Sequence, residues 1–239
     1  LPGLEAADNM ILFRNAVKQI CRRNGYHATF MCRPGLPNAF ASGWHLHQSL
    51  EQISDGTNAF APNKEKQLLS STGMAFAAGI LQNAAGAMVF TSPTVNGYKR
   101  YKPNSLAPDR VVWGRDNKGA MLRIVGAGHG DSATRIENRV GEPAANPYLY
   151  IASQILSGLD GLNNGLVPPE ITDDPYATDA EQLPTNLMDA VTALDESTMF
   201  RQALGNRFVD YFLHIKRAEI ARFLSTVTDW EQREYFELF

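Results

Sequence analysis

The 239-residue sequence has few cysteines and no long apolar run. Only Cys21 and Cys32 are present, and their spacing fits no zinc or redox motif. Two thiols in a chain of this length indicate a reducing compartment, so we expect a cytoplasmic protein with two buried structural thiols. No apolar run reaches the length of a transmembrane helix and no signal peptide is recognisable, so no membrane partner is expected.

The sequence also lacks a strong charge of either sign. Its net charge is −3, from 25 acidic and 22 basic residues that are mixed along the chain. No basic run indicates a nucleic-acid partner, and no acidic tail indicates a solvated arm. The 44% of hydrophobic residues suffice for one sizeable core, or for a core shared with a missing neighbour. The chain begins at Leu1 with a turn that leads into a helix, and we expect it to be truncated.

Periodicity and composition predict the elements. Helices are expected over 5–24, where Gly25 ends the helix, over 66–88 with a break near Gly86, over 147–162, and over most of 187–239. Strands are expected over 26–32, 41–49, 110–113, 120–124 and 135–139. Prolines and glycines predict loops over 33–40, 92–108 and 168–184. Because the strands cluster in the first two-thirds and helices dominate the end, the pattern is α+β.

Two histidines stand two residues apart in one predicted strand. On a strand, His45 and His47 would point to the same face. One could bind a divalent metal ion and the other a phosphate or a ring. The same spacing also fits a partly exposed strand face with no ligand.

A second predicted strand carries three charged residues on one face. Arg135, Glu137 and Arg139 alternate, which places Ile136 and Val140 on the opposite face. Such charges must be solvated, paired or bound to ligands, and an exposed ladder of ion pairs would satisfy them.

A phosphate or carboxylate site would satisfy the same charges. Arg100 and Arg123 are also nearby in the sequence, and planar guanidinium groups suit phosphate and carboxylate. Transfer of phosphate from ATP to a carboxylate needs several such donors, because negative charge accumulates in its transition state.

The glycines of GAGHGD (126–131) imitate a nucleotide-binding loop. No amphipathic helix follows them, however, and SATRIENRV has the pattern of a strand. A hairpin loop between two strands is the better interpretation.

Four ordered motifs resemble the glutamine synthetase family. SGWHLHQSL (42–50) is similar to GSGMHxHxSL, and NGYKR (96–100) is similar to NSYKR. ATRIENR (133–139) is similar to ARRIExR, and EPAANPYL (142–149) with GLDGLNNGL (158–166) is similar to DPAANPYL with GLDGIxNxL. Together they cover most of 27–166, which makes the joint resemblance specific.

The resemblance implies a role for each matching residue. His45 and Glu137 match ligands of one divalent ion, Mg²⁺ or Mn²⁺. The other matching positions are His47 and Ser49 beside the nucleotide, Arg100 and Arg139 on the carboxylates of glutamate, and Arg123 and Arg135 on the phosphates of ATP. Arg100, Arg123 and Arg139 would act in catalysis.

The resemblance also implies a fold and an activity. The fold is the α+β catalytic domain of the family, with a curved antiparallel sheet, flanking helices and a helical C-terminus. Residues 1–239 would be its C-terminal portion, without the small N-terminal domain and the upstream strands that bear metal ligands. The activity is ATP-dependent formation of a γ-glutamyl amide from glutamate and ammonia or an organic amine, through γ-glutamyl phosphate. The family assembles into homo-oligomeric rings, and the chain alone would be inactive.

Three departures from the family pattern concern the substrates. The family motif YKRLVPGYEAP has a glutamate that helps to bind ammonium, whereas YKRYKPNSLAP has Leu106 there. No glutamate occurs anywhere between Lys66 and Ile136. Because an ammonium ion in an apolar pocket is costly unless a carboxylate faces it, an organic amine is favoured over ammonia as the substrate. The loop NAFASGWH differs from DNGSGMH, which bears on glutamate binding, and Lys118 replaces an arginine.

Two other functions and one covalent modification have less support in the sequence. A non-catalytic scaffold with this fold is mildly favoured by Leu106 but has no reason to keep clustered arginines. A kinase of a guanidino substrate shares the broad fold but not these motifs. Tyr176 lies near the position at which some bacterial members of the family have a tyrosine that is adenylylated. Its surroundings, DDPYATDAE, do not match the family's LYDLPP, so we expect an ordinary loop tyrosine.

Overall fold

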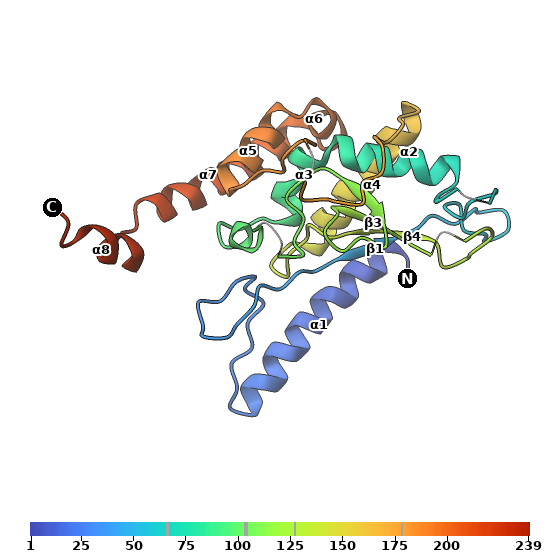
Figure 1. Ribbon diagram of the computed structural model, residues 1–239. Coiled ribbons are helices and arrows are strands. Elements are labelled where there is room, and N and C mark those ends of the chain that lie inside the picture. The colour runs from blue at the N-terminus through green and yellow to red at the C-terminus, as the bar shows by residue number, and fades with distance from the viewer. Residues whose placement is uncertain (66, 103–104, 127, 178) are drawn as a thin grey trace.

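The computed structural model describes residues 1–65, 67–102, 105–126, 128–177 and 179–239. Figure 1 shows a small sheet between helices from both ends of the chain. The described helices are α1 (Gly3–Arg23), α2 (Ser71–Gln82), α3 (Ala84–Thr91), the 3-10 helix η1 (Gly97–Arg100), α4 (Pro147–Asn163), α5 (Leu187–Glu196), α6 (Thr198–Leu204), α7 (Asn206–Leu224) and α8 (Asp229–Tyr235). The strands are β1 (Leu46–Gln48), β2 (Trp113–Arg115), β3 (Leu122–Val125) and β4 (Arg135–Asn138).

The four strands form one sheet in the order β1-β4-β3-β2. β4 pairs antiparallel with both β1 and β3, and the 126–134 connection between β3 and β4 confirms the predicted hairpin, although residue 127 lies outside the described part. β2 and β3 pair in parallel, which differs from the antiparallel sheet that was expected. The short 116–121 connection between them turns at Asp116, whose φ is 50°, and Asn117 accepts the Gly119 N–H at 3.0 Å.

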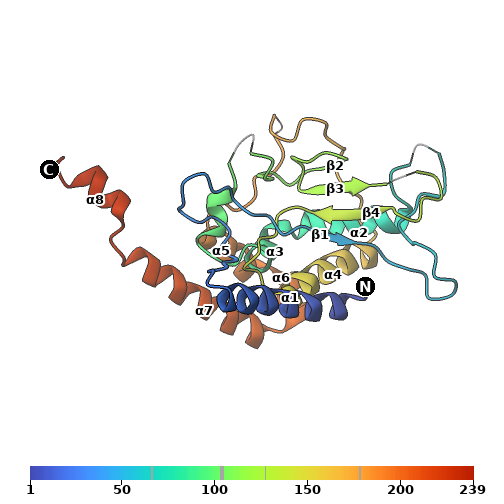
Figure 2. The same cartoon turned by 90° about the horizontal axis from the view of Figure 1, so that it is seen from below.

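One face of the sheet packs on helices α2 and α4 (Figure 2). Leu122, Ile124 and Ile136 are fully buried on this face among Phe76 and Ile80 of α2. Because side chains alternate along a strand, the residues between them project from the opposite face. The predicted α+β class is therefore confirmed, and the sheet has one apolar and one polar face.

Helices α2 and α4 touch through glycines. A Cβ on Gly79 would lie 2.0 Å from the Ser157 carbonyl oxygen, and one on Gly161 would lie 2.0 Å from the Ala75 carbonyl oxygen. Residues with side chains would therefore push the two backbones apart.

The predicted long helix over 66–88 is two helices. It breaks at Asn83 rather than near Gly86, and α2 begins at Ser71, where Ser70 Oγ accepts the Gly73 N–H at 3.0 Å. Residue 66 lies outside the described residues. No single described helix is both long and apolar enough to cross a membrane; α2 and α3 meet that criterion only as a pair bent by 77°.

Helix ends followed the sequence signals in two places. Asn146 caps α4 by accepting the N–H groups of Tyr148 and Leu149, and Pro147 occupies the first turn, as predicted. Gly25 follows α1 with a φ of 76°, a conformation that glycine adopts without strain.

The predicted strand over 26–32 is wrong. In the structure this segment is extended coil, with no strand beside it among the described residues, and Cys32 accepts one backbone N–H from Ser42 at 2.8 Å. A β-forming composition cannot make a strand without a neighbour to complete its hydrogen bonds. The predicted strand over 41–49 is reduced to Leu46–Gln48, the part that faces β4.

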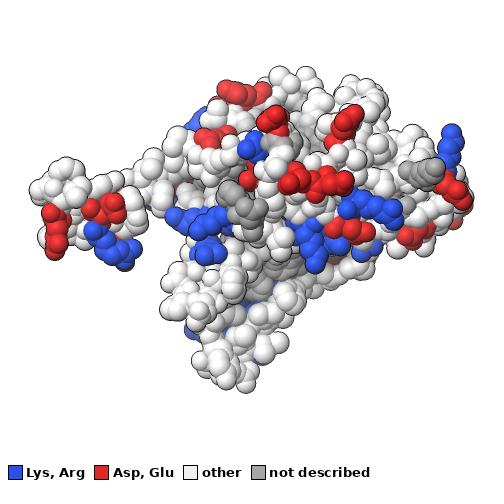
Figure 3. All heavy atoms as spheres, in the orientation of Figure 1, with Lys and Arg blue, Asp and Glu red and all other residues white. Residues whose placement is uncertain are grey.

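Two parts of the chain extend away from the sheet. Helices α7 and α8 extend to one side, and α1 with the coil after it forms a lobe below the sheet (Figure 1). Figure 3 shows few charged side chains on the visible face of this lobe. Large apolar residues of this part of the chain, Leu12, Phe13 and Phe40, are exposed. Both cysteines are free; Cys32 is buried, whereas Cys21 is only partly so, which corrects the expectation of two buried thiols.

Candidate active site

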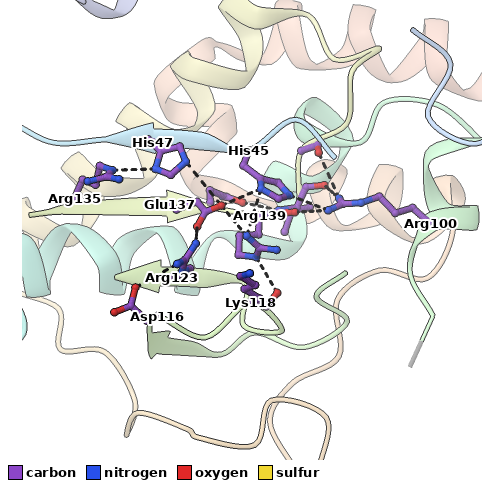
Figure 4. Close-up of polar contacts among 12 residues, drawn as sticks. His45, His47, Arg100, Asp116, Lys118, Arg123, Arg135, Glu137 and Arg139 are labelled. Atoms are coloured by element: carbon purple, nitrogen blue, oxygen red, sulfur yellow. Dashed lines mark hydrogen bonds and ion pairs between the residues drawn. The ribbon is translucent and has the colours of Figure 1, made fainter. Parts of the chain in front are cut away.

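The polar face of the sheet brings predicted site residues from three strands together (Figure 4). His47 of β1 lies opposite Glu137 of β4, and Arg123 of β3 lies on the other side of the same residue. Strand register therefore makes Glu137 the centre of the site, because its two cross-strand neighbours project from the same face.

Glu137 is 2% exposed, and both of its carboxylate oxygens contact neighbouring basic side chains. Its Oε1 accepts from Arg139 Nη1 at 2.7 Å and lies 2.9 Å from His45 Nδ1, while its Oε2 accepts from Arg123 Nη1 at 3.2 Å. Burial alone would raise the pKa of Glu137, but the charge of Arg139, together with the hydrogen bond from Arg123, outweighs it, so the pKa is lowered. The carboxylate therefore stays ionised, and the predicted alternative of an exposed ladder is excluded for Glu137.

His45 is kept neutral. Burial, then Arg139 and Arg100, lower the pKa of His45 to about 4, while Glu137 opposes the shift. Arg100 Nη2 lies 3.2 Å from His45 Nε2, which fits a ring whose Nδ1 carries the proton and donates to Glu137. A neutral imidazole is the form that binds metal ions.

His47 is less enclosed. Its Nδ1 accepts from Arg135 Nε at 3.1 Å, and its Nε2 lies 3.8 Å from Glu137 Oε1. Burial and the nearby arginines lower its pKa against the opposing effect of Glu137. Arg135 is fixed in turn by the Ala133 carbonyl at 2.9 Å.

Arg100 reaches the site from η1 and is held by the backbone beyond β4. It donates to the Val140 carbonyl at 2.9 Å and to the Arg139 carbonyl at 3.0 Å. A Cβ on Gly43 would lie 2.6 Å from both Arg100 Nη2 and His45 Nε2, so a larger residue there would displace the guanidinium or the imidazole. The sequence signal for this contact was the glycine two residues before the first histidine, which sequence reasoning did not use.

The site has an excess of positive charge. Arg100, Arg123, Arg135 and Arg139 lie around the buried carboxylate of Glu137, and Asp116 adds an exposed partner 3.3 Å from Arg123. The Nε of Arg123 is buried and has no hydrogen-bond partner among the described residues. Such an arrangement can bind anionic groups, because phosphates and carboxylates would complete the unused guanidinium donors.

Two predicted site residues need qualification. Ser49 follows β1, is exposed, and makes no side-chain contact with the cluster among the described residues, so the structure does not bring it into the site. Lys118 contributes its carbonyl, which accepts from Arg139 Nε at 2.9 Å and helps to orient that guanidinium.

His45 and Glu137 alone do not make a complete metal site. No group of three or more His, Cys, Asp or Glu side chains that could hold an ion occurs in the described part of the chain. The two residues nevertheless offer a neutral imidazole and an ionised carboxylate 2.9 Å apart, which are donors that divalent ions accept. They fit such an ion only as part of a larger set of ligands.

Leu106 lies in the coil after η1 and has a φ of 59°, unusual for a residue with a side chain. It is 58% exposed. Backbone strain of this kind is concentrated at functional sites, so the position merits a functional test.

Comparisons with known proteins give the family. The family described as "Glutamine synthetase, catalytic domain" matches residues 2–235. A γ-glutamylanilide synthase from an Acinetobacter species is 50% identical, and the match covers 100% of this chain and 50% of that protein. A glutamine synthetase from Halobacterium salinarum is 38% identical, and the match covers 99% of this chain and 53% of that protein.

Solved structures agree with this match. A structure described as "Apo GmaS without ligand" superimposes with a TM-score of 0.87 at 36% identity, covering 98% of this chain and 54% of that one. A GmaS/ADP complex gives a TM-score of 0.88 at 34% identity, covering 99% and 55%. The chain spans about half the length of the curated relatives it matches. By motif order, by the matched length and by its fold, the chain belongs to the glutamine synthetase family.

Proposed function

We propose that the full-length protein is an ATP-dependent ligase that joins glutamate to an amine through γ-glutamyl phosphate. The observation that carries the proposal is the convergence of four arginines around the buried carboxylate of Glu137, which Arg123 and Arg139 contact directly. This chain would form the C-terminal part of the catalytic domain. The remaining part, outside these residues, would supply further metal ligands, and ring-shaped homo-oligomers in the cytoplasm would complete the enzyme.

The arginines divide into two groups in this proposal. Arg100 and Arg139, fixed by backbone carbonyls and by Glu137, would hold the carboxylates of glutamate. Arg123 and Arg135 would contact the phosphates of ATP, and the unused Nε of Arg123 is a donor for that purpose. His47, beside Arg135, would lie on the nucleotide side. Ser49 is assigned to that side by the family motif alone.

His45 and Glu137 would hold a Mg²⁺ or Mn²⁺ ion together with ligands from outside this chain. When bound, such an ion neutralises charge on the phosphoryl group being transferred. This chain would contribute two of the ligands, the neutral ring of His45 and the ionised carboxylate of Glu137, which lie 2.9 Å apart.

The reaction has two steps. An oxygen of the γ-carboxylate of glutamate bonds to the γ-phosphorus of ATP, and the bond to the bridging oxygen breaks so that ADP leaves with the electron pair. The amine nitrogen then bonds to the γ-carbonyl carbon, phosphate leaves with the electron pair of the C–O bond, and one N–H proton passes to the phosphate or to water. The arginines stabilise the negative charge that develops in both steps.

The proposed amine is an organic one. Leu106 stands where related enzymes that use ammonia have a glutamate, and an ammonium ion without a facing carboxylate is costly to bury. An alkyl or aryl amine instead contributes apolar surface, about 0.8 kcal/mol per buried methylene. The 50% identical γ-glutamylanilide synthase supports an arylamine in particular.

Release of ADP by the full-length protein with glutamate and a panel of amines tests the proposal. The panel contains ammonium, ethylamine, a diamine and aniline. We expect a higher kcat/KM for organic amines than for ammonium, and Leu106→Glu should shift the preference toward ammonium. If ammonium is the best substrate of the wild type, the interpretation of Leu106 fails. If no amine supports ADP release, the protein is a non-catalytic member, an alternative that the replacement of the glutamate by Leu106 favours.

A further inference from the structure

The short helix η1 carries Arg100 into the active site. It is four residues long, with Asn96 at its N-cap and Tyr101 at its C-cap. A 3-10 helix of this length has few internal hydrogen bonds, and their geometry is poor. The Arg100 side chain nevertheless points in a definite direction, toward His45 and Arg139 (Figure 4). Contacts with other parts of the chain must therefore hold η1 in place.

The side chain of Asn96 anchors the start of η1. Its Oδ1 accepts the Arg33 N–H at 2.8 Å, and its Nδ2 donates to the Arg33 carbonyl at 2.9 Å. Both hydrogen bonds are partly buried and join residues that stand 63 positions apart in the sequence. One side-chain amide thereby satisfies both polar groups of a backbone residue in the coil before β1.

The loop that begins at this anchor returns to Arg100. Residues 33–41 form the loop, and the Ser42 N–H closes its base by donating to the Cys32 carbonyl at 2.8 Å. Gly43 follows, and a Cβ there would lie 2.6 Å from Arg100 Nη2. One end of the loop is therefore bound to the start of η1, and the other end packs against the guanidinium. A shift of the loop base would change the space around Arg100.

Tyr101 anchors the other end of η1. Its phenol donates to the Val140 carbonyl at 2.6 Å, and Arg100 Nη1 donates to the same carbonyl at 2.9 Å. The central carbon of the Arg100 guanidinium lies 5.5 Å from the centre of the Tyr101 ring, which is a cation–π distance. Burial raises the pKa of Tyr101 to about 12, against the opposing effects of Arg100 and of a hydrogen bond with the Ser92 side chain. The phenol therefore keeps its proton at neutral pH and acts as the donor.

The tyrosine after Arg100 is a departure from the family motif. YKRLVPGYEAP has a leucine directly after the arginine, whereas YKRYKPNSLAP has Tyr101. A leucine side chain can neither donate to a carbonyl nor attract a cation to its face. Arg100 therefore has two supports in this chain, a ring and a shared hydrogen-bond acceptor, that the motif residue would not provide.

We propose that Asn96 and Tyr101 are positioning residues, which act through the two ends of η1 to hold Arg100 in the direction that binds a carboxylate of glutamate. This inference rests on the proposed ligase function and extends it to two residues outside the predicted site. A guanidinium binds a carboxylate through two parallel hydrogen bonds only when it faces the carboxylate correctly. A side chain that is fixed beforehand also loses less freedom on binding. Loss of either anchor should weaken glutamate binding, while ATP, assigned to Arg123 and Arg135, should bind as before.

Substitutions at both ends of η1 in the full-length protein test the proposal through the KM values for glutamate and for ATP, each measured with the other substrates saturating. Asn96→Ala and Tyr101→Leu should each raise the KM for glutamate about five- to tenfold, with a smaller change in kcat and less than about a twofold change in the KM for ATP. Tyr101→Phe keeps the ring and should raise the KM for glutamate only about two- to threefold. Asn164→Ala and Tyr211→Ala, at exposed positions, are the matched controls and should change neither KM.

The outcomes separate this inference from the proposed function. Equal rises in the KM values for glutamate and ATP, or a lower kcat with both KM values unchanged, would show that the two residues only support the fold, and the inference would be overturned. An unchanged KM for glutamate also overturns it. If Asn96→Ala does not fold, Tyr101→Leu, which restores the residue of the family motif, decides the question. A wild type that releases ADP with no amine overturns the proposed function itself.

Discussion

Arg139 Nη1 donates to Glu137 Oε1 at 2.7 Å, and both side chains are almost fully buried. The two residues stand two positions apart in the sequence, so their side chains share one face of the chain. The pair joins the proposed metal ligands to the proposed glutamate ligands. A change on either residue should therefore affect both metal and glutamate.

Glu137→Ala should weaken Mn²⁺ binding in the full-length protein and lower ADP release by at least about a hundredfold. The variant removes the only carboxylate that both Arg123 and Arg139 contact, which leaves their charges uncompensated. Calorimetry with Mn²⁺ and an ADP-release assay measure the two effects. Glu137→Gln keeps the side-chain volume and should behave similarly, while Glu196→Ala on exposed α5 should not. Activity within a few-fold of the wild type would show that the metal assignment is wrong.

Arg139→Lys should raise the KM for glutamate by about tenfold or more, with a smaller effect on the KM for ATP. Arginine donates from Nη1 to Glu137 and from Nε to the Lys118 carbonyl at the same time. A lysine amine cannot span both acceptors while it also holds a carboxylate. Steady-state kinetics of the full-length variant provide the measurement, and Arg22→Lys on the exposed surface of α1 is the control. Equal changes in the KM values for glutamate and ATP would contradict the assignment of Arg139 to glutamate rather than to ATP.

The chain of residues 1–239 on its own should release no ADP with glutamate and any amine. It provides His45 and Glu137 as candidate ligands, and no group of three such side chains exists in its described part. Divalent ions that bridge phosphates need more oxygen ligands than these. A coupled assay for ADP with the isolated chain gives the answer, and turnover above background would refute the prediction.

Glu142→Gln should make the stability of the protein less dependent on pH. Glu142 is fully buried, and burial raises its pKa above the ordinary value of 4.5 despite the hydrogen bond from Thr94 Oγ1 at 2.7 Å. The native state therefore holds this proton more tightly than the unfolded chain. The stability that the protonated Glu142 contributes to the fold is fully present below about pH 4.5, and it is lost as the pH rises through the raised pKa.

The measurement for Glu142 is the difference in Tm between the variant and the wild type from pH 4.5 to pH 8. Glutamine stays neutral at every pH, so the Tm of the Glu142→Gln variant relative to that of the wild type should increase as the pH rises. The titratable and charged groups around the carboxyl are Cys32, Tyr98, Tyr101, Arg14 and Lys216. These groups are the same in both proteins, and Glu196→Gln is the exposed control. A difference that stays constant or shrinks with rising pH would contradict the assignment.

Gly79→Ala should destabilise the fold by about 1–3 kcal/mol. The added methyl group would lie 2.0 Å from the Ser157 carbonyl oxygen, so α2 and α4 would have to separate. Gly35→Ala is the matched control, because a Cβ there meets nothing within 4 Å. Urea unfolding of both variants measures the change. Equal stabilities would mean that the two helices can shift at little cost.

The sequence by itself determined the features that depend on local chemistry. Asn146 and Pro147 specify the start of α4 because the cap and the proline act on the first turn alone. The alternation of Arg135, Glu137 and Arg139 placed them on one face of β4 because a strand has a period of two. The ordered motifs identified the family, and the predicted hairpin after β3 was correct for the same local reason.

Only the tertiary structure decided which of these residues meet and how deeply they are buried. Whether 26–32 forms a strand, and whether β2 pairs in parallel, depends on which backbone lies alongside, and no local preference encodes a partner. Glu137 is buried because β1 and β3 flank it, and Tyr176 reaches Gly119 because Pro169 and Thr172 are hydrogen-bonded to Trp113 of β2. Contacts between segments far apart in the sequence are set by packing, so the site exists only once the chain has folded.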